Sequence, residues 1–154
     1  MIRRFINIAL NAVAFMAVIT AFLPLLSWKR LEGVPVPSDF DIHGMVNGVG
    51  GRGVLLTFAL LALGMFILMV LAQFFPQLVS LPVPKNRSAV AKEVKRDMAA
   101  QLNLLMAFLF SFCANSSLSI AAGKAQALSM WVVWVIVALA LLCIGAALFR
   151  LFRR

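Results

Sequence analysis

Four long apolar runs dominate this chain of 154 residues, and none of them holds a charged residue between its ends. A transmembrane helix needs about 20 apolar residues. Because lipid offers no partner for an unpaired backbone N–H or C=O group, helices are the natural spanning structures. The sequence therefore predicts an all-α integral membrane protein with four transmembrane helices in a single membrane domain. The domain covers residues 1–154, with spans at about 5–28, 54–75, 98–122 and 128–149.

Composition leads to the same class of protein. Hydrophobic residues make up 64% of the chain and charged residues 12%, whereas an average soluble domain has about 25% charged residues. The first run follows a basic start, as in a signal peptide. It is longer than the roughly 7–15 apolar residues of such a peptide, and it offers no small-x-small cleavage site. We therefore expect an uncleaved first helix that ends near Trp28.

The basic residues are distributed unevenly between the two sides of the predicted spans. With the N-terminus inside, ten Lys and Arg residues lie on the cytoplasmic side and four on the other. Because basic residues in short loops favour the cytoplasmic side, we expect both termini in the cytoplasm, an outer loop at 29–53 and a cytoplasmic loop at 76–97. The net charge of +9 is then explained by orientation and predicts no nucleic-acid partner. The ten are Arg3, Arg4, Lys85, Arg87, Lys92, Lys95, Arg96, Arg150, Arg153 and Arg154; the four are Lys29, Arg30, Arg52 and Lys124.

Helix breakers mark some of the connections and are missing from others. Pro76 ends the second run because proline has no backbone N–H, and the short proline-rich piece after it is expected to be an interfacial connector. No breaker separates Ser88, a residue suited to an N-cap, from the third span. One helix is therefore expected to start near Ser88 and to continue through that span. Residues 123–126 are expected to form a tight turn.

Two of the spans carry polar residues at helical spacing. Asn7 and Asn11 share one face of the first span, and Ser111, Asn115 and Ser119 form a stripe on the third. Polar residues within the bilayer face other helices or a cavity. We expect the stripe to form interhelical hydrogen bonds, worth about 0.6 kcal/mol each on average. The alternative is a polar lining for a ligand groove.

Catalysis needs titratable groups that converge, and the spans contain no Asp, Glu, Lys, Arg or His. A proton-coupled transporter or ion pump usually carries such a residue at membrane depth, so a small-solute transporter is disfavoured. We predict no catalytic residues, no cofactor and no enzymatic activity. The two cysteines, Cys113 and Cys143, lie at depths that differ by about 10 Å, too far apart for a disulfide, and are expected to be buried free thiols.

The outer loop holds a cluster of ionisable residues. Asp39, Asp41 and His43 could offer oxygen and nitrogen ligands to a divalent metal, and on a strand their side chains would share one face. Three ligands without a second cluster make a weak site, so we predict no bound metal. The carboxylates are expected instead to accept backbone N–H groups in turns or to pair with Arg52. His43 is expected to be solvated or hydrogen-bonded.

The segment from Pro37 to Gly44, followed by Asn47 and Arg52, resembles the P-x-H-F-(N/D)-x-x-G…(D/N)…K pattern of a bacterial membrane family. That family is the domain of unknown function 1648, found at the front of SdpI-type immunity and signal-transduction membrane proteins. Asp39 stands where the family usually has His, and Arg52 where it usually has Lys. The resemblance covers about residues 23–87. The matching or candidate binding residues are Pro37, Asp39, Phe40, Asp41, His43, Gly44, Asn47 and Arg52.

The resemblance implies a multi-pass protein of the bacterial cytoplasmic membrane, related to a protein that confers immunity to a secreted peptide toxin and signals by sequestering a repressor. We therefore expect the 29–53 loop to recognise an extracytoplasmic peptide or a membrane-protein partner. Two alternatives are a loop that only caps the helix bundle and a chain that is an accessory subunit of a larger membrane complex. Because a lone four-span bundle has a small interior, a homo-oligomer is also compatible with the sequence.

Overall fold

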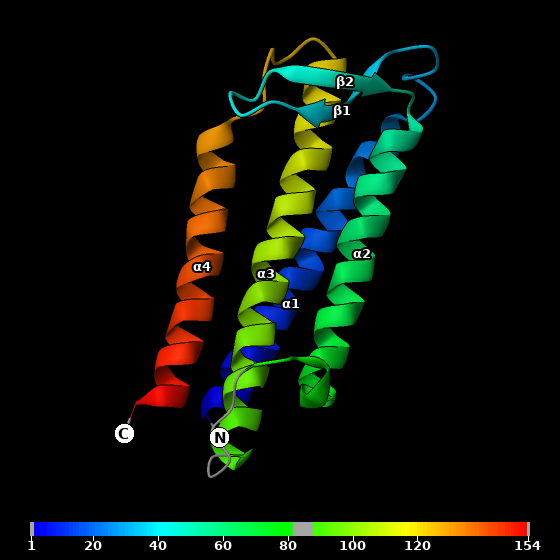
Figure 1. Cartoon of the computed structure of the whole chain (residues 1–154). Helices are drawn as coiled ribbons and strands as arrows, with labels where there is room; N and C mark the ends of the chain where they lie inside the picture. The colour runs from blue at the N-terminus through cyan, green and yellow to red at the C-terminus, as the bar shows by residue number, and fades with distance from the viewer. Residues whose placement is uncertain (1, 82–87, 154) are drawn as a thin grey trace.

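Four long helices account for most of the computed structural model, which describes residues 2–81 and 88–153 (Figure 1). They are α1 (Ile2–Phe22), α2 (Gly53–Phe74), α3 (Ser88–Ala121) and α4 (Met130–Phe152). Each is long and apolar enough to cross a membrane, as the prediction of four spans requires. Two short 3-10 helices, η1 (Leu23–Ser27) and η2 (Pro76–Leu78), follow α1 and α2.

The bounds of the helices differ from the predicted ones in places. α1 gives way to η1 ahead of Trp28, because Pro24 cannot donate a backbone hydrogen bond. α3 starts at Ser88 and runs unbroken into the third span, as the lack of a breaker predicted. α4 begins later than predicted and extends through Arg150. The connector after Pro76 begins with η2, and residues 82–87 lie outside the described part of the chain.

The bundle has two distinct ends. The start of α1 and the last turn of α4 lie at the same end, which we call the terminal end (Figure 1). The opposite end, which we call the hairpin end, carries two antiparallel strands, β1 (Val36–Phe40) and β2 (Val46–Gly50). The loop predicted at 29–53 therefore contains a β-hairpin, and the description of the fold as all-α is wrong in this respect. Asp41 and Gly44 stabilise the turn between the two strands.

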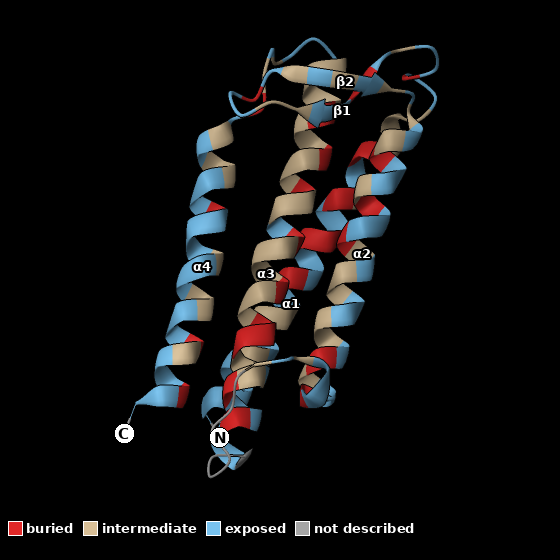
Figure 2. Cartoon of the chain, viewed as in Figure 1, coloured by how far each residue is buried: buried red, intermediate tan, exposed pale blue. Residues whose placement is uncertain are grey.

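Small side chains hold the first three helices together. Ala14, Ala17 and Ala21 of α1 are buried against Ala62 of α2 and Ala107 of α3. Small residues let helix backbones approach closely, and this is how helices pack in lipid, where no hydrophobic force draws them together. The buried residues of α1 accordingly face α2 and α3 (Figure 2).

α4 is attached differently from the other three helices. It packs mainly against α3, and its buried residues are only Ile136, Ala147 and Leu151. Ala147 and Leu151 lie in an apolar cluster with residues of the first turns of α3. Most of the remaining surface of α4 is exposed, as its pale blue colour in Figure 2 indicates. α4 is therefore the peripheral helix of the bundle.

The hairpin lies across the ends of the helices rather than beside them (Figure 1). Val36 of β1 is fully buried, in a cluster with Leu31 of the preceding loop and Leu55 of α2. Leu118 of α3 packs against the same cluster. The hairpin is thus joined to the bundle by an apolar contact under its first strand.

Candidate functional site

The turn of the hairpin is built around the carboxylate of Asp41. Its Oδ1 atom accepts hydrogen bonds from the backbone N–H groups of His43 (2.8 Å) and Met45 (2.9 Å). The backbone of Asp41 also donates to the Met45 carbonyl (2.9 Å) and accepts from Gly44 (3.0 Å). An Asp side chain that bonds backbone groups ahead of it in the chain is a typical turn-forming device. Asp41 therefore holds the turn together.

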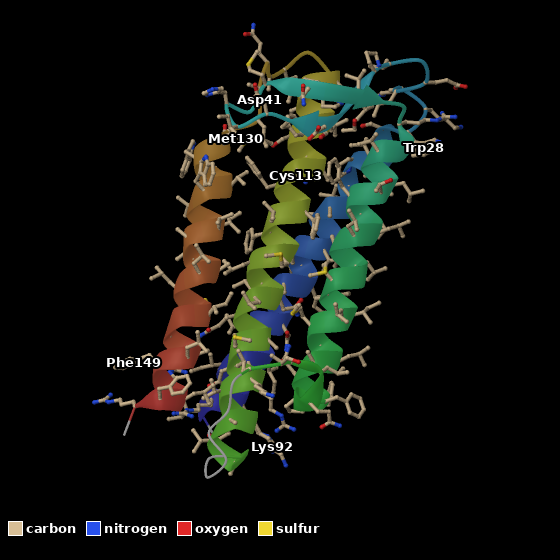
Figure 3. The ribbon with its side chains drawn as sticks, viewed as in Figure 1. Trp28, Asp41, Lys92, Cys113, Met130 and Phe149 are labelled. Atoms are coloured by element: carbon tan, nitrogen blue, oxygen red, sulfur yellow. The ribbon has the colours of Figure 1, made fainter. Side chains whose placement is uncertain are left out.

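Gly44 joins this turn to the connection between α3 and α4. Its carbonyl accepts a hydrogen bond from the Leu128 N–H (2.8 Å), 84 positions further along the chain (128 − 44 = 84). Gly44 has a φ of +82°, and a Cβ atom added there would overlap the Leu128 carbonyl oxygen. Glycine is required at this position for both reasons. The same Cβ atom would lie 3.0 Å from the side chain of Met130, at the start of α4, which Figure 3 labels together with Asp41 of the turn.

The other acidic residue of the hairpin also makes a local bond. Asp39 lies on β1 and accepts a hydrogen bond from the N–H of Phe40 (2.9 Å). β1 ends at Phe40, so Asp39, Asp41 and His43 do not lie on one strand. No group of three possible metal ligands occurs among residues 2–81 and 88–153. Of the remaining candidate binding residues, Pro37 is buried and Asn47 is exposed.

Arg52 precedes α2 and contacts the segment that follows η1. Its guanidinium donates to the Trp28 carbonyl (3.3 Å), lies 4.9 Å from the centre of the Trp28 ring and is 3.7 Å from a carboxylate oxygen of Glu32. Of the two alternatives predicted for Asp39 and Asp41, acceptance of backbone N–H groups is observed and pairing with Arg52 is not. Those two carboxylates are occupied by backbone N–H groups, and Glu32 is the acid within reach. The Glu32 side chain is 76% exposed, so the ion pair itself adds little stability.

Three apolar side chains of the hairpin are exposed. Ile42 is 71% exposed, Met45 is 53% and Val49 is 63%. Ile42 and Met45 belong to the turn, and Val49 lies on β2. The sheet has two strands only among the described residues, so each strand has one edge without a strand neighbour. The hairpin thus presents apolar side chains and open strand edges together.

The polar stripe of α3 is used inside the bundle. The Ser111 hydroxyl hydrogen-bonds the hydroxyl of Thr20 of α1. The Asn115 amide donates to the Thr20 carbonyl (3.0 Å) and to the Ser111 carbonyl (2.9 Å). The Ser119 hydroxyl donates to the Asn115 carbonyl within α3 (2.9 Å). Ser111 and Asn115 thus link α1 to α3, while the hydroxyl of Ser119 bonds within its own helix. Both cysteines are free thiols, and Cys113 lies on α3 (Figure 3).

A second polar group joins three helices towards the terminal end. Asn11 of α1 exchanges two hydrogen bonds with Gln73 of α2 (2.7 and 3.1 Å) and accepts a third from Asn103 of α3 (2.8 Å). Asn103 is fully buried, and its Oδ1 atom has no hydrogen-bond partner among the described residues. Gln73 was not among the polar residues predicted to join the helices. The feature that could have predicted its role is that it is a lone amide in an otherwise apolar run.

Charged residues surround this polar group at the terminal end. Asp97 of α3 accepts a hydrogen bond from the Asn7 amide (2.9 Å) and pairs with Arg150 of α4 (3.6 Å). Arg3 pairs with Glu93 (3.2 Å). Asp97 is only 15% exposed, so its charge is stabilised by both partners. These contacts connect α1, α3 and α4 at the end where Ala147 and Leu151 of α4 pack against the first turns of α3.

Comparisons of the chain with protein-family models, with curated proteins and with solved structures found no match. A function therefore has to be inferred from the side chains of the hairpin and of the terminal end. The hairpin is the better candidate for recognition, because it combines exposed apolar residues with a turn that is tied to the helices.

Proposed function

We propose that this chain is a non-enzymatic, four-span protein of the bacterial inner membrane that recognises an extracytoplasmic peptide through its hairpin, as its resemblance to the SdpI-type family implies. In this proposal both termini are cytoplasmic and the hairpin faces outward, because the basic residues are concentrated at the terminal end. The observation that carries the proposal is the exposure of Ile42, Met45 and Val49 on a hairpin fixed to the bundle.

The hairpin offers two features that peptide recognition uses. An extended peptide can add a strand to an open sheet edge, where backbone hydrogen bonds give affinity and alternate side chains give specificity. Apolar residues such as Ile42 and Val49 supply contact area next to that edge. β1 packs on the helix ends through Val36, so the edge of β2 is the one we propose for the peptide.

The roles of the acidic and basic loop residues follow from their contacts. The Asp41 carboxylate is occupied by two backbone N–H groups, and the Arg52 guanidinium by Trp28 and Glu32. We therefore propose that Asp41 and Arg52 position the hairpin and do not touch the peptide. Their replacement weakens recognition by displacing the hairpin.

The proposal is tested by a protection assay. A strain that lacks the gene is complemented with the wild-type chain, with the double variant Ile42→Ser/Val49→Ser, or with the control Lys124→Gln, an exposed residue of the α3–α4 connection. Growth is measured in the low-molecular-weight fraction of spent medium from the same strain. Wild type and control should restore growth, and the hairpin variant should not, at equal membrane levels. Equal growth of the hairpin variant, or full growth of the deletion strain, would refute the proposal.

A second candidate function is that of an accessory subunit in a larger membrane complex. It is favoured by the one-sided packing of α4, whose Trp131 and Trp134 are 70% and 57% exposed. Asn11 and Asn115 bond within the bundle, so a partner would dock on α4. Copurification of a partner in mild detergent, lost on Trp131→Ala/Trp134→Ala, would support this function. Purification of the chain alone would contradict it.

A further inference from the structure

A groove of about 620 Å³ lies between α1 and α2 towards the terminal end. This volume falls within the roughly 300–1,000 Å³ typical of ligand sites. Its polar part includes Arg4, Asn11, Gln73 and Arg96, and its apolar part includes Phe66 and Val70. A neighbouring hollow of about 510 Å³ shares Arg4 and Arg96 with it. The two arginines therefore stand where the two hollows meet.

The positive charge of the groove is not balanced by the protein. Glu93 and Asp97 line the neighbouring hollow, but Glu93 pairs with Arg3 and Asp97 with Arg150. Arg4 has no hydrogen-bond or ion-pair partner in the described ranges of the chain. The Arg96 Nε atom donates to the Gln73 carbonyl (2.8 Å), a bond that leaves its charge unneutralised and holds the guanidinium beside the groove.

The groove changes from polar to apolar along α2. From Gln73 to Phe66 the helix rises about 10 Å, and both residues line the groove. Ile8 and Phe74, which also line it, are 66% and 70% exposed. Exposed apolar residues on a membrane-spanning helix face the acyl chains of the bilayer. The groove is therefore open to lipid on its apolar side and positively charged at the side nearest the terminal end of the bundle.

We propose that this groove binds one anionic phospholipid from the leaflet at the terminal end. The headgroup phosphate lies between Arg4 and Arg96, since guanidinium groups bind phosphate oxygens through paired N–H donors. The amides of Asn11 and Gln73 face the glycerol region, and an acyl chain follows Val70 and Phe66. The cationic groups and the apolar wall match the two parts of this one ligand.

The test is native mass spectrometry of the protein released from nanodiscs that contain equal amounts of phosphatidylglycerol and phosphatidylcholine. Wild type should retain one phosphatidylglycerol in preference to phosphatidylcholine. Arg4→Gln/Arg96→Gln should lower this retention by a factor of about 25, at about fivefold for each arginine near the membrane surface. The control Lys29→Gln/Lys124→Gln removes the same charge at the hairpin end and should retain the lipid as wild type does.

Two further variants separate a groove from general attraction to the membrane. Arg4→Gln alone leaves the Arg96–Gln73 bond intact and should lower retention about fivefold, which keeps the test valid if the double variant fails to fold. Val70→Trp keeps every charge but fills the apolar part and should also release the lipid. Equal losses in the two double variants, full retention by Val70→Trp, or displacement of the lipid by inorganic phosphate alone would overturn the proposal.

Discussion

The replacement of Gly44 by alanine tests the contact that ties the hairpin to the α3–α4 connection. A non-glycine residue in the left-handed region costs about 1–2 kcal/mol. The new methyl group would also overlap the Leu128 carbonyl, and the hairpin can avoid this overlap only by giving up the bond from Leu128 N–H to the Gly44 carbonyl. A hydrogen bond of this kind contributes about 1 kcal/mol. The Gly44→Ala variant should therefore lose about 2–3 kcal/mol of local stability.

Two other glycines of the chain separate these contributions. Gly33 has a φ of +74° but nothing within 4 Å of an added Cβ atom. Gly51 has neither a positive φ nor a neighbour within 4 Å. Gly33→Ala should therefore cost only the backbone term of about 1–2 kcal/mol. Gly51→Ala should be neutral or stabilising by about 0.5 kcal/mol, because alanine restricts the unfolded chain.

The assay is hydrogen exchange of the protein in nanodiscs, followed at the Leu128 amide. Since 1.4 kcal/mol corresponds to a factor of ten, a loss of 2 kcal/mol in Gly44→Ala should speed exchange at Leu128 by a factor of about 30. Gly33→Ala and Gly51→Ala should leave this amide close to wild type. If Gly33→Ala accelerates exchange at Leu128 as much as Gly44→Ala, the contact between the turn and the α3–α4 connection is not what protects it.

Three further predictions concern the turn, the amide group and the orientation. Asp41→Ala should destabilise the hairpin by about 1–2 kcal/mol in the same exchange experiment, because two backbone N–H groups lose their acceptor. Asp41→Asn keeps an acceptor oxygen and should lose less stability. Equal effects of the two variants would contradict the role of the carboxylate. Asn11→Leu should lower the free energy of unfolding in mixed micelles by about 1–2 kcal/mol, since Gln73 and Asn103 lose their shared partner. An unchanged unfolding midpoint would show that these three amide side chains do not hold the helices together. In intact cells, the Ile42→Cys variant should react with a membrane-impermeant maleimide. A reporter fused to the C-terminus should be active in the cytoplasm. The reverse result in both experiments would contradict the proposed orientation.

The helices were predictable because their causes are local in the sequence. Runs without charge and the absence of a breaker after Ser88 required no knowledge of tertiary contacts. The end of α1 at Phe22 also has a local cause, because regular helical hydrogen bonding stops at Pro24. The α-helix ends at Phe22, but η1 continues the first span to Ser27, close to the predicted end at Trp28.

The hairpin and its partners were harder to predict because they depend on contacts distant in the sequence. Glu32 and Arg52 are 20 positions apart (52 − 32 = 20) and share no periodic pattern. The contact of Gly44 with Leu128 depends on how two connections meet at one end of the bundle. A positive φ at Gly44 was foreseeable from its place in a turn, but its tight packing was not. Asp39, Asp41 and His43 do not share one face of a strand, because β1 ends at Phe40 and the turn begins at Asp41.

The peripheral place of α4 has a consequence for the order in which the protein is made. α1, α2 and α3 share the alanine-lined core, and they precede α4 in the chain, so synthesis delivers a complete three-helix unit first. The turn at Gly44 is made early but receives the Leu128 N–H only when the last connection emerges. Arrival of α4 therefore completes the hairpin at one end and, through Arg150 and Asp97, the charged cluster at the other. α4 is thus the last helix to be made, and its contacts complete both ends of the bundle.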